Sequence, residues 1–171
     1  MTEEDIFERT KDAYLGLIHP KRRDDAYRQE IAPVIALASS VPDDLIVAMI
    51  TATGWRERLL GLCLAMAKRP STFTDAMLQT LRDPRGIAIV PVCAALAVLA
   101  RCGAFTVPQS FSEMFDRGAF DGEIGWATDK AMCVAGLRAD DVPGRGPNYG
   151  QDFGDHFEVY DWIQKGGRNN R

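Results

Sequence analysis

The feature that most constrains this chain is a short apolar segment that occurs three times, each time with a cysteine at its fourth position. The segments are LGLCLAMA at 60–67, VPVCAALA at 90–97 and KAMCVAGL at 130–137. Each follows a turn and a shorter segment with helical periodicity, so each is interpreted as the second helix of a pair. Helical pairs that recur along a chain are typical of stacked repeat proteins, in which each repeat packs on its neighbours.

Capping residues and prolines mark helix boundaries throughout the chain. Thr2 with Asp5 fits the start of a first helix, and Pro42 precedes two aspartates that suit a helix N-terminus. Apolar residues between these marks fall at helical spacing, whereas the alternation typical of strands is nearly absent. The pattern predicts an all-α fold, with helices near residues 3–18, 24–39, 42–53, 55–68, 73–82, 85–101, 108–116 and 122–138.

Two of these predicted helices contain a proline. Pro33 falls within 24–39, and Pro91 falls within 85–101. A proline in a helix interior removes one hydrogen bond and clashes with the carbonyl group four residues earlier. We therefore expect both helices to be kinked or divided.

The length and composition of the chain favour one domain. A chain of 171 residues that is 46% hydrophobic can bury a sizeable core. We expect a single domain over 1–171, with a helical repeat core at about 3–139 and an irregular C-terminal extension at 140–171. The glycine-rich GRGPNYG at 144–150 is interpreted as a linker, and the aromatic residues after it are expected to pack back on the helices.

The charge of the chain disfavours some partners. The formal net charge is −4 and the pI is near 5.2, so the sequence lacks the basic surplus that nucleic-acid binding uses. The acidic start MTEEDIFERT is unlike a secretory signal. The longest apolar run, at 87–100, is shorter than a membrane-spanning helix. We expect a cytoplasmic protein without membrane contact, and the charge disfavours nucleic acid as its partner, although a local basic patch stays compatible with the composition.

The four cysteines are interpreted as core residues. Cys63, Cys93, Cys102 and Cys133 form no CxxC pair, and three of them stand among small apolar residues. Such cysteines usually behave as small buried hydrophobic side chains. Cys102 follows Arg101 at a predicted helix end and is expected to be the most exposed. We predict no metal and no cofactor.

The sequence resembles HEAT-like helical-repeat proteins. GWRERLLG at 54–61, together with the apolar segment containing CAALAVLARCG at 93–103, is similar to an uncharacterised bacterial family known only as a domain of unknown function. The resemblance covers about residues 40–140. Small acidic repeat proteins of this kind are similar to the immunity proteins of bacterial toxin systems, which neutralise a partner by binding it. The resemblance implies no catalytic residues.

A group of polar side chains in the tail supports an enzymatic alternative. Five side chains with oxygen or imidazole donor atoms stand within ten residues of the sequence: Asp152, Asp155, His156, Glu158 and Asp161. They would suit a metal-assisted hydrolase, although their spacing fits no known metal loop and an acidic solvated face explains them more simply. The HEAT-like resemblance adds a nucleic-acid glycosylase to the enzymatic alternatives.

A candidate partner-binding face is suggested by charged and aromatic residues near the starts of the second helices. In stacked helical pairs, equivalent positions line up on one edge of the array. Tryptophan and arginine also contribute strongly to binding energy at protein interfaces. The candidate residues are Trp55, Arg56, Arg58, Asp83, Arg85, Glu123, Trp126 and Asp129. For any one of them, a core or capping role is the simpler explanation.

The sequence therefore predicts a non-enzymatic protein-binding repeat protein, plausibly an immunity-type inhibitor of a bacterial toxin. Its acidic surface would occupy a basic active site, with carboxylates in place of phosphates. The alternatives are a hydrolase or nucleic-acid-processing enzyme that uses His156 and nearby carboxylates, and a structural subunit whose tail completes a homodimer.

Overall fold

The computed structural model of the chain describes residues 1–11, 13–21, 25–115, 120–139, 142 and 152–166. Every regular element in these ranges is a helix, which confirms the all-α prediction. The α-helices are α1 (Glu3–Thr10), α2 (Ala13–Gly16), α3 (Asp25–Leu37), α4 (Asp43–Ile50), α5 (Trp55–Lys68), α6 (Thr74–Arg82), α7 (Ile89–Arg101), α8 (Asp121–Val134) and α9 (Phe153–Gln164). Short 3-10 turns are η1 (Pro70–Phe73), η2 (Gly86–Ala88) and η3 (Phe111–Glu113).

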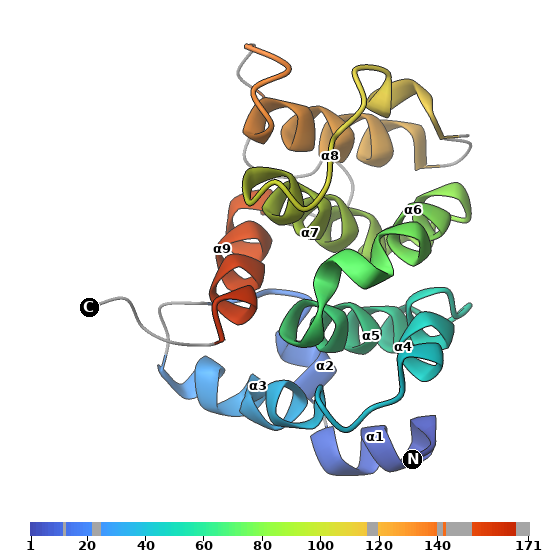
Figure 1. Cartoon of the computed structure of the whole chain (residues 1–171), viewed down its shortest axis with the longest axis vertical. Coiled ribbons are helices and arrows are strands. Elements are labelled where there is room, and N and C mark those ends of the chain that lie inside the picture. Colours follow the sequence, from blue (N-terminus) through green and yellow to red (C-terminus); the bar gives the residue numbers. More distant parts are fainter. Residues whose placement is uncertain (12, 22–24, 116–119, 140–141, 143–151, 167–171) are drawn as a thin grey trace.

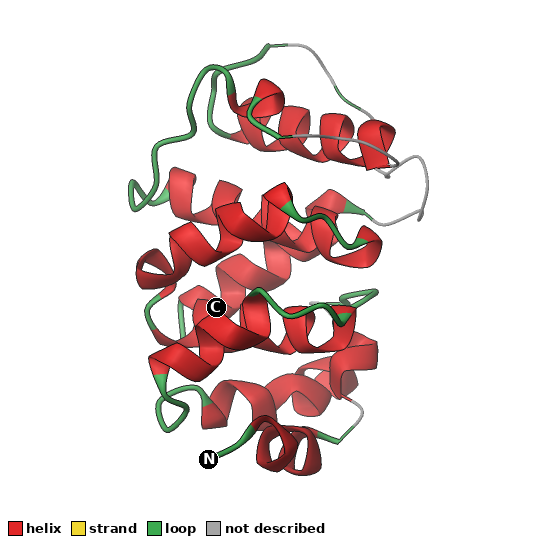
Figure 2. Cartoon of the chain, turned by 90° about the vertical axis from the view of Figure 1, so that its right-hand side faces the viewer, coloured by secondary structure: helices red, strands yellow, loops and turns green. Residues whose placement is uncertain are grey.

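The helices are stacked along the long axis of the molecule. Helices α1, α2 and α3 lie at one end and α8 lies at the other, with α4 to α7 between them (Figure 1). A view from the side shows the same succession of helical layers (Figure 2). The main packing partners are α4 with α5, α7 with α8, and α7 with α9. The first two cysteine-centred segments lie within α5 and α7, and the third, at 130–137, covers the last turn of α8 and the residues after it.

The capping signals read from the sequence act as expected at two helix starts. The Thr2 side chain accepts a hydrogen bond from the Asp5 amide at 3.2 Å, and the Asp5 carboxylate accepts one from the Thr2 amide at 2.7 Å. This reciprocal pair satisfies two amides that have no partner within α1. Helix α4 begins directly after Pro42, with Asp43 and Asp44 in its first turn.

The single helix predicted over 3–18 is divided, so this prediction is wrong. Helix α1 ends at Thr10 and α2 begins at Ala13. Lys11 lies between them with a φ of 47°, a left-handed conformation that non-glycine residues rarely adopt. The turn sets α1 at an angle to α2, and this angle opens one wall of the site described below.

The two prolines affect their helices differently. Helix α3 runs without a break from Asp25 to Leu37 with Pro33 inside it, so the expected division is absent there. The predicted helix over 85–101 is shorter, because η2 precedes α7. Pro91 then falls in the first turn of α7, where its missing N–H group has no partner within the helix to lose.

The helix predicted over 108–116 is wrong in the part that the structure describes. Only η3 forms there, and an aromatic cluster holds the connection in place. The Phe111 ring meets the rings of Phe105 and Phe115 edge to face, with centroids 6.3 and 5.4 Å apart. These contacts bury Phe111 fully, so packing decides the conformation more than helical periodicity does.

Helices α4 and α5 approach each other closely where α5 crosses the end of α4. A β-carbon built on Gly61 would lie 2.8 Å from the backbone nitrogen of Ile50 and 2.8 Å from the β-carbon of Met49. A larger residue at position 61 would force the two helices apart. Gly61 therefore permits backbone contact between α4 and α5.

The C-terminal extension contains a helix and is not irregular in its described part. Helix α9 begins after Asp152, the N-cap, whose carboxylate accepts a hydrogen bond from the Gly154 amide at 2.7 Å. It packs on α7 and α5 and buries Tyr160 and Trp162, which confirms that the tail aromatics pack back on the helices. The predicted linker at 144–150 lies outside the described residues.

The cysteines follow the prediction with one exception. Cys63 and Cys93 are buried in α5 and α7, and Cys102 is exposed at the end of α7. Burial raises the pKa of the Cys63 thiol to about 12, so it stays protonated at neutral pH. Cys133 in α8 is only half-buried, because α8 is the last layer of the stack and has a neighbour on fewer sides.

Candidate functional site

The structure divides the eight predicted binding residues into three separate groups. Trp55 and Arg56 lie at the start of α5, where α5 meets α1 and α2. Arg58, Asp83 and Arg85 connect α5 to the end of α6. The remaining three residues belong to α8, at the opposite end of the molecule (Figure 1). They do not form one continuous face.

Arg58 is an interior side chain that links three segments of backbone. It is only 2% exposed. Its guanidinium group donates to the carbonyl oxygens of Ala52 at 2.5 Å and Asp83 at 2.7 Å, and to that of Thr80 at 3.4 Å. It also pairs with the Asp83 carboxylate at 3.3 Å. Arg58 therefore stabilises the fold and contributes nothing to a binding surface.

Burial and pairing act on Arg58 in opposite directions. Burial lowers the pKa of its guanidinium group, and the Asp83 carboxylate opposes this effect. An arginine remains charged even so, because its pKa lies far above neutrality. Asp83 also pairs with Arg85 at 3.1 Å, so two arginines share this one exposed carboxylate, and the charge of Arg85 adds to the effect of burial on Arg58.

Thr80 is a structural residue that sequence analysis missed. Its hydroxyl group donates to the carbonyl oxygen of Ile50 at 2.8 Å, which joins α6 to the end of α4. The side chain is buried. No local signal identifies such a residue, because its partner lies 30 positions away in the sequence.

The predicted residues of α8 are mainly interior as well. Glu123 is fully buried, and Trp126 is 8% exposed. The Trp126 ring meets Phe153 of α9 edge to face at 6.3 Å. Asp129 is half-buried and forms an ion pair with Arg138 at 2.6 Å. Glu123 and Trp126 are therefore excluded from a partner-binding surface, since packing at the last layer covers them.

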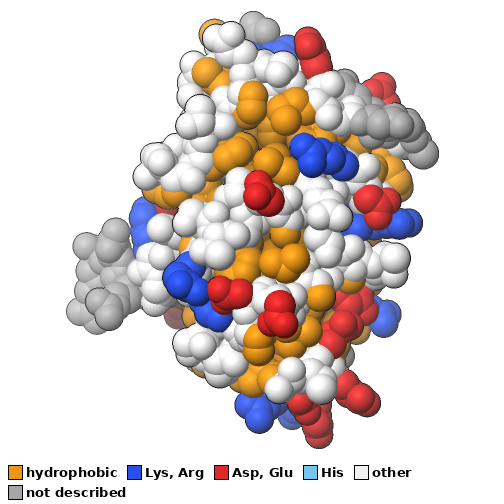
Figure 3. Space-filling view, turned by 45° about the vertical axis from the view of Figure 1, so that its right-hand side comes forward, with side chains coloured by type: hydrophobic (Ala, Val, Ile, Leu, Met, Phe, Trp, Pro, Cys, Tyr) orange, Lys and Arg blue, Asp and Glu red, His pale blue; other side chains and the backbone are white. Residues whose placement is uncertain are grey.

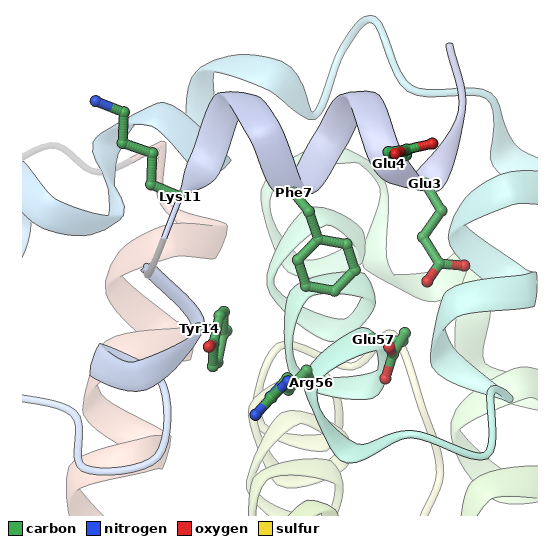
Figure 4. A pocket seen from close by; sticks show the side chains of 7 residues that line it. All are labelled: Glu3, Glu4, Phe7, Lys11, Tyr14, Arg56 and Glu57. Atoms are coloured by element: carbon green, nitrogen blue, oxygen red, sulfur yellow. The ribbon is translucent and has the colours of Figure 1, made fainter.

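Arg56 borders a pocket of about 640 Å³ between α1, α2 and the start of α5, and Trp55 lies next to it, against Tyr14. Ligand pockets in proteins commonly fall between about 300 and 1,000 Å³, so this volume suffices for a ligand group. Figure 4 shows Phe7 pointing from α1 into the middle of the pocket. The lining residues are Glu3, Glu4, Phe7, Lys11, Tyr14, Arg56 and Glu57.

Two aromatic rings, Phe7 and Tyr14, line this pocket, and Trp55 packs against the second of them. Phe7 and Tyr14 meet edge to face with centroids 6.2 Å apart, and Tyr14 meets Trp55 at 5.7 Å. The Arg56 guanidinium group lies 5.2 Å from the centre of the Tyr14 ring and 5.3 Å from that of Trp55. These cation–π contacts fix the exposed arginine against the aromatic residues.

Charges of opposite sign lie on opposite sides of Phe7. Glu3 extends toward Glu57 on one side, and Arg56 lies with Tyr14 on the other (Figure 4). The Lys11 side chain extends away from the pocket (Figure 4). The pocket therefore has an acidic end, an apolar centre and a cationic end, an arrangement that suits a ligand with both polar and apolar groups.

Gly54 allows Glu57 to take its place in the pocket wall. A β-carbon at Gly54, the N-cap of α5, would lie 1.9 Å from a carboxylate oxygen of Glu57. The Glu57 side chain thus folds back over the glycine at the start of the helix. Any side chain at position 54 would displace this carboxylate.

Of the residues predicted from the sequence, Arg56 lines this pocket and Trp55 lies beside it, whereas the lining residues of α1 and α2 were not predicted. Glu3, Phe7 and Lys11 stand four positions apart, so they share one face of a helix and its end. That spacing was a detectable signal. The location of Tyr14 was not, because it depends on the turn at Lys11.

The polar residues of the tail do not assemble into an enzymatic site. His156 is 1% exposed, so no substrate reaches it in this structure. Burial chiefly, and the charge of His19, lower the pKa of His156 to about 3, while a hydrogen bond with the backbone of Ile18 opposes the change. Its imidazole ring is therefore neutral at pH 7.

The carboxylates of the tail are engaged elsewhere. Asp161 pairs with Lys165 at 2.9 Å and with Arg101 of α7. Burial raises the pKa of Asp161, but its hydrogen bonds with Lys165 and Arg101 outweigh this and lower the pKa overall. Across the described ranges, no group of three or more histidine, cysteine or acidic side chains is placed to hold a metal ion.

Comparisons with known proteins add no functional assignment. Neither family models, nor curated proteins, nor solved structures give a match to this chain. In the part of the chain that the structure describes, no helix has the length and apolar character needed to cross a membrane.

Proposed function

We propose that this chain is a non-enzymatic helical-repeat protein that binds a protein partner at the pocket formed by α1, α2 and the start of α5. The observation that carries the proposal is the exposed Arg56, held over Tyr14 and Trp55 beside an apolar pocket. Arginine and aromatic residues next to a pocket are the side chains that most often dominate binding energy at protein interfaces.

A HEAT-like arrangement is the repeat architecture that we propose. Each cysteine-containing helix packs against elements that precede it in the chain: α5 against α4, α7 against α6 and η2, and α8 against η3 and α7. Cys63 and Cys93 are buried at equivalent positions in their segments. Successive helical pairs that contact mainly their neighbours are the defining property of such arrays.

An immunity-type inhibitor of a bacterial toxin, acting in the cytoplasm, is the role that we propose within this class. The net charge of −4 suits a basic partner. Acidic, basic and apolar side chains are interspersed on the face shown in Figure 3, as expected for a surface that recognises protein. The apolar pocket with charged ends adds a site for a specific anchor residue.

A capture experiment with matched variants tests the proposal. The tagged chain and an Arg56→Ala, Phe7→Ala double variant are used to capture partners from the native host, followed by mass spectrometry. The control is Arg101→Ala, Phe157→Ala, which removes the same two residue types outside the pocket, where the guanidinium group lies 4.4 Å from the ring centre. Circular dichroism establishes that each variant is folded.

We expect a stoichiometric partner that the control retains and the pocket variant loses. Retention of that partner by both variants would contradict the location of the site. Light scattering over a range of concentrations tests the alternative of a structural homodimer, which requires a mass that doubles in the absence of any other protein.

A further inference from the structure

The charges at the pocket indicate what enters it. We infer that its occupant is a lysine or arginine side chain presented by an exposed segment of the partner protein, with its charged group at Glu3 and Glu57 and its alkyl stem on Phe7. This inference rests on the proposed function and specifies the chemistry of the partner residue.

The acidic end of the pocket lacks a cation of its own. Glu3 and Glu57 come from different helices, and the Glu3 side chain points toward Glu57 (Figure 4). Among the described residues, neither carboxylate has an ion pair within 4.0 Å, whereas Asp43, Asp83, Asp129 and Asp161 each have one. Two neighbouring carboxylates repel, and a positive charge between them removes this repulsion.

The two cations of the pocket are directed elsewhere. Arg56 lies over the rings of Tyr14 and Trp55, on the far side of Phe7 from the carboxylates (Figure 4). Lys11 extends out of the pocket (Figure 4). With Glu4 included, the lining holds three carboxylates and two cations, so its charge balance also favours a cation.

The apolar centre selects a cation with a long stem. Phe7 stands between the two charged ends and is only partly covered by the protein core. Lysine and arginine can lay their methylene groups on an apolar surface while their charged ends reach polar partners. A bare metal ion or ammonium ion would leave the Phe7 ring uncovered, so charge and surface together favour these two side chains.

Peptide titration tests the inference on the full chain. Four nine-residue Gly/Ser peptides, each with a single central Arg, Lys, norleucine or Glu, are titrated into ¹⁵N-labelled protein and followed by NMR. Amide signals of residues 3–11 and the Trp55 indole report on the pocket. Calcium chloride is a fifth ligand.

We expect the Arg and Lys peptides to shift these signals with dissociation constants on the order of 1 mM, the weak affinity of a single anchor. A Glu3→Gln, Glu57→Gln variant should bind them about fivefold more weakly, since two exposed ion pairs are lost. Glu8→Gln with Asp75→Asn removes the same charge from exposed positions outside the pocket and should bind as the wild type does.

Four outcomes would overturn the inference. Equal binding of the norleucine peptide would indicate an apolar anchor, and preferred binding of the Glu peptide would assign the site to Arg56. Calcium that displaces the Arg peptide would indicate a metal site. If no signal shifts at a peptide concentration ten times the expected dissociation constant, on the order of 10 mM, no such side chain binds.

The capture experiment separates this inference from the proposed function. A partner that is lost with Arg56→Ala, Phe7→Ala but retained by Glu3→Gln, Glu57→Gln would support the location of the site and overturn the cationic anchor. A partner retained by both variants would overturn the location itself, whatever the peptides do.

Discussion

Arg56 and Arg58 stand two positions apart at the start of α5, and they face opposite environments. Arg56 is exposed and stacks on Tyr14 and Trp55, whereas Arg58 is 2% exposed and donates to backbone carbonyl groups. Residues two positions apart point to nearly opposite sides of a helix. One side of α5 thus forms a pocket and the other holds α6, although the motif GWRER presents both arginines alike.

The largest expected effect is the loss of Arg58. We predict that Arg58→Ala lowers the free energy of unfolding by about 3 kcal/mol, because hydrogen bonds from a charged donor to buried carbonyl groups are lost. Urea denaturation followed by circular dichroism measures this change. A loss no greater than that of Arg56→Ala would remove the distinction between the two sides of α5.

A second buried basic group, His156, extends the comparison because burial keeps it neutral. The pKa of His156 is about 3 in the folded chain and near 6.5 when unfolded, so the unfolded state binds more protons between these values. The contribution of neutral His156 to the free energy of unfolding is then fully present above pH 6.5 and falls as the pH decreases toward 3. We expect a loss of about 2 kcal/mol at pH 5 relative to pH 7.

A variant isolates the contribution of His156. His156→Gln cannot be protonated in this range, so its stability should change little between pH 7 and pH 5. Equal slopes in the two proteins, measured by urea denaturation at each pH, would show that His156 is not buried in its neutral form.

A smaller effect is expected at the exposed partner of Arg58. Asp83→Asn removes the carboxylate that lies 3.3 Å from the guanidinium group but keeps the Asp83 carbonyl oxygen that accepts its shorter bond. We predict a loss of about 1 kcal/mol, because the Asp83 side chain is exposed and its charge is screened. If added salt steeply lowers the free energy of unfolding of the wild type but not of this variant, the ion pair contributes more to stability than we predict.

The smallest effect is expected for Arg56 itself. Arg56→Ala should lower the free energy of unfolding by no more than about 1 kcal/mol, since it loses exposed cation–π contacts alone. Thermal denaturation gives this value directly. The same substitution should impair partner capture, so stability and binding separate at this residue and not at Arg58.

Helix positions were predictable where local signals agree with packing. Local signals and packing agree at the capping box of Thr2 and Asp5 and in the cysteine-centred segments of α5, α7 and α8. The division at Lys11 was not predictable, because no glycine or asparagine marks its left-handed turn. The prediction of a helix over 108–116 was wrong for another reason, since apolar residues of this segment form an aromatic cluster in place of a helix.

The candidate site was predictable only in part. Trp55 and Arg56 stand out in the sequence, but Phe7 and Tyr14 belong to short elements that tertiary packing brings to α5. Arg58 and Glu123 look like surface residues because they are charged, yet both are buried. Composition and periodicity do not identify a charged residue whose partners are distant backbone groups.

Site-specific photocrosslinking tests the central claim most directly. In one variant a benzophenone amino acid replaces Glu4 at the pocket. In a second variant it replaces Arg85, which lies after α6 near the buried Arg58. Each variant is crosslinked in the native host. Both residues are exposed, so both probes reach solvent. The account predicts a single crosslinked partner from position 4 and none from position 85. A crosslink from position 85 alone would place the binding surface on the side that we assign to stability.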